Sequence, residues 1–192
     1  MKKIILCLWG LWDWLYFHCN RMEYVSKGDN IFRVVRKTYK GPPLITNSGQ
    51  WICPGDEIIK IHLYNYQLAK EILNFSSDVA YVLYLRKGIQ RSMQGLSAYI
   101  IDLPDYERIK AIMGTSMLNR GAERFGFYKH GVEDTWYYRL KAYLYKFIYM
   151  LIHPQGLRYL KQHGSKLEIQ HLVITVQELL QRYAHESGKP SS

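Results

Sequence analysis

The sequence predicts an α+β fold, in which an antiparallel β-meander is extended by one or two strands and packed with about five to six helices. Residues 32–64 alternate in polarity, are rich in β-branched side chains and are divided by Gly, Pro and Asn turns. On both sides of that region, apolar residues recur at three- and four-residue intervals, which is typical of helices. The 192 residues contain no internal repeat or low-complexity linker, so we expect one domain over residues 1–185 and a disordered tail over residues 186–192.

Residues 4–22 predict a first helix, whose apolar stripe includes Leu8, Trp12 and Leu15 while Asp13 falls toward the other side. We expect the apolar stripe to dock on the core. The alternative is a helix that lies in the plane of a membrane with its apolar face down. The apolar run is shorter than the roughly 20 residues of a membrane span, and no signal-peptide cleavage site follows it. We therefore expect a cytoplasmic protein, and peripheral attachment to the inner face of the membrane stays open as an alternative.

The meander is predicted from short segments separated by tight turns. Its strands are expected at residues 32–39, 44–46, 50–53 and 57–63. In the last strand, Ile59, Ile61 and Leu63 share one face. Ile58, Lys60, His62 and Tyr64 share the other face. The first set is expected to be buried.

The remainder of the chain predicts helices and short strands. Helices are expected at residues 66–75, 78–94, 118–125, 136–152 and 166–183. Strands are expected at residues 96–103, 110–113 and 126–128. In the helix over residues 136–152, the stripe that contains Trp136, Tyr143 and Phe147 is expected to face the core.

The excess of basic residues predicts an affinity for polyanions. Lys and Arg outnumber Asp and Glu by 26 to 16, which gives a formal net charge of +10. Anionic glycan, an anionic lipid surface and nucleic acid are all open as partners, and no protein partner is predicted. The alternative is that the charge is scattered and solvated. The candidate anion-binding residues lie in two segments and are Arg86, Arg91, Arg139, Lys141, Tyr145 and Tyr149.

A second group of candidates, Asp56, His62 and Asn65, lies on and beside the strand over residues 57–63. A carboxylate, an imidazole and an amide near one strand could bind a ligand or polarise its hydroxyl group. Asp56 and His62 are separated by about 20 Å along an extended strand, so they cannot meet unaided. Asp56 is also typical of a turn former, and His62 of a histidine held within a sheet.

The histidines and cysteines show no spacing typical of metal ligands. The seven histidines lack H-x-x-x-H and H-x-H patterns, and the three cysteines lack C-x-x-C. We therefore predict no metal site and no cofactor, and expect the cysteines to be reduced, buried thiols. The sequence leaves open whether the chain is an enzyme.

One motif points to an enzymatic alternative. The segment of residues 85–91 resembles the pyrophosphate-binding turn of the GCN5-related acetyltransferases, and Phe125-Gly126-Phe127 resembles a Gly-Phe pair late in that family. Gln90 stands where the family has a small residue that lets backbone amides approach phosphates. An acyltransferase that uses a coenzyme-A thioester is therefore an alternative function.

Four other motifs resemble the YkoP-like family of Bacillus and its relatives. They are Tyr39-Lys40-Gly41-Pro42-Pro43-Leu44, Pro54-Gly55-Asp56-Glu57-Ile58, Ile61-His62-Leu63-Tyr64-Asn65 and Arg124-Phe125-Gly126-Phe127. This family's domain also occurs fused to polysaccharide deacetylases, so the resemblance implies an accessory or binding module linked to cell-envelope polysaccharide. The Asp-Asp and His-x-x-x-His metal motifs of those deacetylases are absent from this chain. A nucleic-acid-binding domain is the further alternative.

Overall fold

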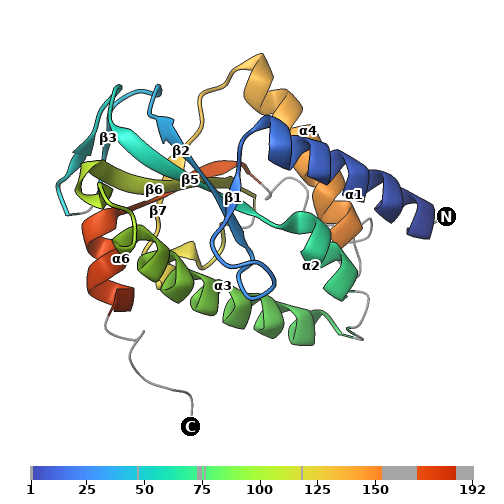
Figure 1. Cartoon of the computed structure of the whole chain (residues 1–192). Helices are drawn as coiled ribbons and strands as arrows, with labels where there is room; N and C mark the ends of the chain where they lie inside the picture. The colour runs from blue at the N-terminus through green and yellow to red at the C-terminus, as the bar shows by residue number, and fades with distance from the viewer. Residues whose placement is uncertain are drawn as a thin grey trace, which may run out of the picture.

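A mixed six-stranded sheet lies at the centre of the computed structural model, which describes residues 2–46, 48–72, 75, 77–117, 119–152 and 168–184. The strand order is β1-β2-β5-β6-β8-β7 (Figure 1). The strands are β1 (Glu23–Tyr24), β2 (Phe32–Thr38), β5 (Glu57–Leu63), β6 (Ile109–Ser116), β7 (Tyr128–Gly131) and β8 (Gln170–Thr175). The predicted α+β class is confirmed.

Helices lie on both sides of this sheet. The helices are α1 (Lys2–Cys19), α2 (Asn65–Ile72), α3 (Asp78–Ile101), α4 (Trp136–Ile152) and α6 (Val176–Tyr183). Helices α3 and α6 lie on one side of the sheet, whereas α1 and α4 lie on the other, with α2 in contact with both of the latter (Figure 1). The main hydrophobic core fills the space between the sheet and α3 and α6, where Leu96, Ile112 and Leu179 are fully buried.

The strand order differs in one respect from the predicted meander. β2 pairs directly with β5, in register from Phe32 opposite Leu63 to Thr38 opposite Glu57. Between them in sequence, β3 (Leu44–Ile45) and β4 (Trp51–Ile52) form a separate two-stranded sheet. The Pro42-Pro43 pair offers no backbone donors, so the chain leaves the sheet after β2. Ile52 of this hairpin packs over the sheet instead of extending it.

Two segments have the opposite secondary structure to the predicted one. Residues 96–103 were predicted as a strand, but α3 continues to Ile101, because Met93, Leu96 and Ile100 recur at helical spacing and are all buried. Residues 170–175 were predicted as part of a helix, but they form β8. Its last four residues are all buried, on both faces of the sheet, so no alternation marks the strand.

A capping box marks the start of α6, although the apolar periodicity of residues 166–183 predicted one continuous helix. Thr175 and Glu178 form a capping box, in which each side chain accepts a hydrogen bond from the other residue's backbone N–H. The strand therefore ends and the helix begins at Thr175.

The predicted short helix over residues 118–125 is a 3₁₀ helix at Ala122–Phe125. The predicted strand at residues 110–113 lies within β6, and the one predicted at residues 126–128 begins at Tyr128. The predicted tail over residues 186–192 lies outside the described residues.

Gly126 joins the 3₁₀ helix to β7 in a conformation that other residues rarely adopt. Its φ is +90°, and a Cβ placed there would lie 2.7 Å from Arg182 Nη1 and 2.9 Å from Ile174 Cδ1. The glycine of the Gly-Phe pair noted in the sequence is therefore explained by backbone geometry and close packing.

Helices α1 and α4 are oriented opposite to the sequence prediction. Trp12 of α1, and Trp136, Tyr143 and Phe147 of α4, were expected in the core, yet all four are exposed. Asp13 faces the sheet, where its carboxylate pairs with buried Arg33 at 2.8 Å. The sheet face beneath these helices presents polar side chains, so the polar sides of the helices pack against it.

Candidate functional site

A row of polar side chains crosses the sheet on the face toward α1 and α4. Arg33 lies opposite His62, and Thr115 lies opposite His171, which in turn lies opposite His130. His62 and Thr115 each stand two residues beyond the pair Lys60 and Met113 in the parallel strands β5 and β6. Paired residues present their side chains to the same face, so this row crosses β2, β5, β6, β8 and β7.

Arg33 holds α1 on the sheet. The residue is 3% exposed, and its guanidinium lies 3.6 Å from the ring centroid of Tyr64 and 4.9 Å from that of Phe17. Burial opposes its charge, but the hydrogen bond and charge of Asp13 outweigh that effect and raise the pKa of Arg33. Because its charge is already paired, Arg33 has a structural role.

His171 is hydrogen-bonded at both ring nitrogens. Its Nδ1 lies 3.1 Å from Thr115 Oγ1, and its Nε2 lies 3.2 Å from the Tyr138 hydroxyl oxygen. Burial, followed by the charges of Lys141 and Lys60, lowers the pKa of His171 to about 4. The imidazole is therefore neutral at pH 7 and joins β8 to β6 and to α4.

His62 is also neutral at pH 7. Burial is the largest cause that lowers its pKa to about 4, and the charges of Lys141 and Lys60 follow. The ring of Tyr16 packs edge-on at 6.1 Å between centroids. The charges of Lys141 and Lys60 lower the pKa values of both His62 and His171, so the two imidazoles lie around one site.

Lys141 and Lys60 supply the charge of this site. Lys141 is half-buried, and its ammonium lies 5.4 Å from the ring centroid of Tyr145 and 5.8 Å from that of Tyr138. Burial, followed by the charge of Lys60, lowers the pKa of Lys141 to about 8. Lys60 is exposed at the margin, where partial burial and then the charge of Lys37 lower its pKa.

Within the described part of the chain, neither lysine forms an ion pair with a carboxylate. We call this group the lysine–histidine site; its residues are Lys60, His62, Tyr138, Lys141, Tyr145 and His171. Two ammonium groups beside neutral imidazoles and tyrosine hydroxyls offer many donors and an unbalanced positive charge. This arrangement suits an anion and disfavours a cation. Among the residues that the structure describes, no cluster of His, Cys, Asp or Glu is placed to hold a metal ion.

The structure brings together three of the residues predicted from the sequence, His62, Lys141 and Tyr145. Tyr145 and Lys141 are both half-buried, and burial raises the pKa of Tyr145. His171 was not predicted as a site residue, because residues 170–175 were predicted as helix. Lys60 shares one strand face with His62, and this was the available signal for its place in the site.

The other predicted residues lie elsewhere. Asp56 is a turn residue whose carboxylate accepts a hydrogen bond from the Cys53 backbone N–H at 2.8 Å. Asn65 begins α2. Arg139 is exposed and pairs with Asp134 through two hydrogen bonds of 2.8 and 2.7 Å. The side chain of Tyr149 lies outside the described residues.

Arg86 and Arg91 are exposed on α3, across the sheet from α4. The two predicted anion-binding segments therefore do not form one surface. The resemblance of residues 85–91 to a pyrophosphate-binding turn is wrong, because these residues lie within α3 and their amides are committed to helical hydrogen bonds. The prediction of buried thiols is also wrong, since Cys7, Cys19 and Cys53 are free but exposed.

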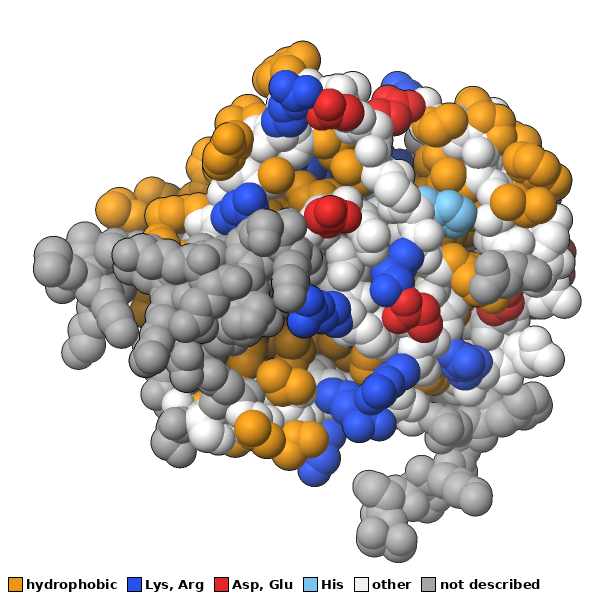
Figure 2. All heavy atoms as spheres, turned by 180° about the vertical axis from the view of Figure 1, so that it is seen from behind, with side chains coloured by type: hydrophobic (Ala, Val, Ile, Leu, Met, Phe, Trp, Pro, Cys, Tyr) orange, Lys and Arg blue, Asp and Glu red, His pale blue; other side chains and the backbone are white. Residues whose placement is uncertain are grey.

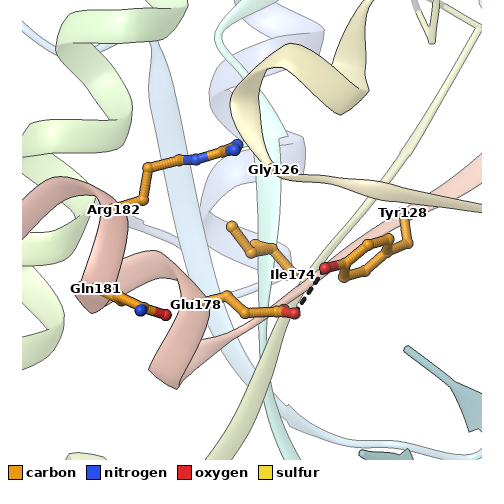
Figure 3. Close-up of a pocket in the computed structure, with 6 residues that line it drawn as sticks. All are labelled: Gly126, Tyr128, Ile174, Glu178, Gln181 and Arg182. Atoms are coloured by element: carbon orange, nitrogen blue, oxygen red, sulfur yellow. Dashed lines mark hydrogen bonds between the residues drawn. The ribbon is translucent and has the colours of Figure 1, made fainter. Parts of the chain in front are cut away.

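A shallow pocket of about 400 Å³ lies between β7 and α6 (Figure 3). Tyr128 points toward Glu178 and donates a hydrogen bond of 2.6 Å to its carboxylate. Glu178 also accepts hydrogen bonds from Thr175 at the start of α6. The acidic group of this pocket is therefore used to hold β7 and α6 together, and we assign it no ligand.

Comparisons with known proteins support the resemblance seen in the sequence. A family model described as the YkoP domain matches residues 2–183. The uncharacterized protein YkoP of Bacillus subtilis (strain 168) is 34% identical over 128 residues, which cover 66% of this chain and 70% of that protein. A search of solved structures finds no match.

Proposed function

We propose a binding function for this chain, which belongs to the YkoP family. The lysine–histidine site takes an anionic ligand. The observation that carries the proposal is the presence of two neighbouring ammonium groups, on Lys60 and Lys141, without a carboxylate partner among the described residues. Partial burial of like charges costs free energy, and a bound anion offsets that cost.

An acidic saccharide is the ligand that fits this site best. Its carboxylate or sulfate group accepts hydrogen bonds from the two ammonium groups, and its hydroxyl groups pair with the imidazoles and tyrosine hydroxyls. The ring of Tyr137 lies exposed beside Lys141 and offers a flat surface to the apolar face of a sugar. Such a module fits a role in cell-envelope polysaccharide metabolism.

Binding is tested by thermal unfolding and calorimetry with sulfate and with an oligogalacturonate. A ligand at 100 times its Kd stabilises the native state by about 2.7 kcal/mol. Lys141→Gln is expected to remove this stabilisation. The matched control is Arg139→Gln, which removes a cation from the exposed side of the same helix. Equal effects of the two substitutions would show that binding depends only on net charge and would overturn the proposal.

The pH dependence of sulfate binding tests whether Lys141 is the group that binds. Its pKa of about 8 means that its charge is lost as the pH rises through 8. Sulfate does not titrate in this range, so its affinity is expected to fall between pH 7 and pH 9. Lys141→Arg should make the affinity fall less over the same range, because a guanidinium stays protonated. An unchanged affinity in the unsubstituted protein would contradict the assignment.

A coenzyme-A acyltransferase is a second candidate function, supported by one observation. β5 and β6 are the parallel pair of the sheet, and their pairing ends at Lys60 and Met113 although the strands continue to Leu63 and Ser116. Parting of the two strands beyond this pair would admit a ligand beside His62. Coenzyme A in the same unfolding assay tests this function. Stabilisation by sulfate and saccharide without stabilisation by coenzyme A would favour the binding module.

A further inference from the structure

Helices α1 and α4 present apolar faces to the outside of the molecule. On α1 the exposed side chains include Leu8, Leu11, Trp12, Trp14 and Leu15. On α4 they include Trp136, Leu140, Tyr143, Leu144 and Phe147. Figure 2 shows hydrophobic side chains gathered along the side of the molecule where α4 lies. We call these two faces together the apolar helix surface. Single exposed apolar residues need no explanation, but two helices that expose whole stripes do.

The two stripes belong to one side of the protein. After the larger effect of burial, Tyr137 of α4 raises the pKa of Tyr16 of α1, and Tyr16 raises that of Tyr145, so these side chains lie close together. Both helices also contact α2. The stripes are therefore neighbours on the surface, although α1 and α4 are more than a hundred residues apart in sequence.

The polar sides of both helices are occupied by the protein itself. Asp13 of α1 pairs with Arg33, and Lys141 of α4 belongs to the lysine–histidine site. A helix on the surface of a water-soluble domain has the opposite arrangement, with its apolar side inward. Here the outward side is rich in Trp and Leu, which is the composition of a helix that lies in the interface of a bilayer.

We infer that the apolar helix surface docks on an anionic lipid bilayer. No helix among the described residues is long and apolar enough to cross a membrane, so the helices lie along its surface. Indole and phenol rings are favoured at the depth of the lipid headgroups. The net charge of +10 complements anionic lipid rather than neutral lipid. The inference does not depend on the lysine–histidine site, whose ligand could be free in solution.

The test is flotation of the full chain with phosphatidylcholine vesicles and with equimolar phosphatidylcholine–phosphatidylglycerol vesicles. The variant Leu11→Ser with Leu144→Ser changes one leucine on each stripe. The matched control, Val82→Ser with Leu83→Ser, changes two aliphatic residues on the outer side of α3, and all four side chains are between 51% and 65% exposed. Circular dichroism verifies that both variants remain folded.

The unsubstituted chain is expected to float with the anionic vesicles and far less with neutral ones. The stripe variant should lose at least about tenfold in partition coefficient, while the α3 control should keep its binding.

Absence of binding to anionic vesicles at low salt overturns the inference, as does an equal loss in both variants. Equal binding to neutral vesicles overturns the preference for anionic lipid. A dimer that the stripe substitutions dissociate, in a chain that binds no vesicles, would assign the surface to a second copy instead. Loss of sulfate binding in Lys141→Gln with vesicle binding retained would show that the two proposals stand separately.

Discussion

The two faces of the central sheet hold their helices by different interactions. On the face toward α3 and α6, the sheet presents Ile59, Ile112 and Ile174. The helices contribute buried Leu96 and Leu179 to the same hydrophobic core. On the face toward α1 and α4, away from the hairpin, the sheet presents Arg33, His62 and His171. There the helices contribute Asp13, Tyr138 and Lys141.

This difference shows that the apolar stripe of a helix does not by itself identify its docked side. A helix buries the side whose groups can pair with the surface that it faces. Leaving a buried arginine without a carboxylate costs more free energy than leaving a leucine exposed to solvent. On the polar face the apolar stripes are left outward, free to contact a bilayer.

Removing the charge of Asp13 should give the largest loss of stability. The side chain of Arg33 is 4% exposed and that of Asp13 is 13% exposed. Asp13→Asn leaves the arginine without a counter-charge, which should lower the free energy of unfolding by about 3–5 kcal/mol. The control is Asp134→Asn, because the Asp134–Arg139 pair is exposed to solvent and should contribute little to stability. Urea unfolding measures both, and equal losses would contradict the structural role of Arg33.

Truncating a leucine distinguishes the apolar face from the polar face. Leu96→Ala on α3 opens a cavity in the core and should cost about 2–5 kcal/mol. Leu11→Ala on α1 removes the same atoms from an exposed side chain and should change stability by less than about 0.5 kcal/mol. Chemical denaturation in the absence of lipid measures the difference. A comparable loss at Leu11 would mean that α1 buries its apolar stripe in solution.

The histidines of the polar face should make stability fall in acid. In the folded protein the pKa values of His62 and His171 are about 4, below the ordinary value of 6.5. Between these values the unfolded chain binds more protons, so lowering the pH from about 6.5 to 4 favours unfolding. The unfolding midpoint of His62→Gln with His171→Gln should fall less steeply over this range. Since carboxylates titrate in both proteins, the difference between the two curves is the measurement, and parallel curves would contradict burial of neutral imidazoles.

Lys141 should give the smallest effect, and one of opposite sign. Lys141→Met removes the cost of holding a half-buried cation near Lys60, so the free energy of unfolding should rise by about 0.5–2 kcal/mol. The same substitution should abolish sulfate binding. Arg139→Met, on the exposed side of α4, should change neither property by much. Destabilisation by Lys141→Met would indicate that the lysine has a structural role instead of a binding one.

The apolar face of the fold could be predicted well from the sequence. Ile59 on one side of its strand is buried as expected, and Ile61 and Leu63 pack at the edge of the same core. The candidate site could be predicted only in part. His62, Lys141 and Tyr145 were identified individually, but His171 and Tyr138 reach them through pairings between β6, β8 and α4 that no local pattern encodes.

By itself the sequence determined the α+β class, the positions of most helices and strands, the excess of positive charge and the resemblance to the YkoP family, because each follows from local spacing or composition. The tertiary structure alone decided the strand order, the placement of Arg86 and Arg91 away from α4, and the outward direction of the stripes on α1 and α4. This is because an amphipathic helix can pack by either side, and the surface that it packs against determines which side is buried. The partner here is a sheet face whose buried arginine and neutral histidines come from strands far apart in the sequence.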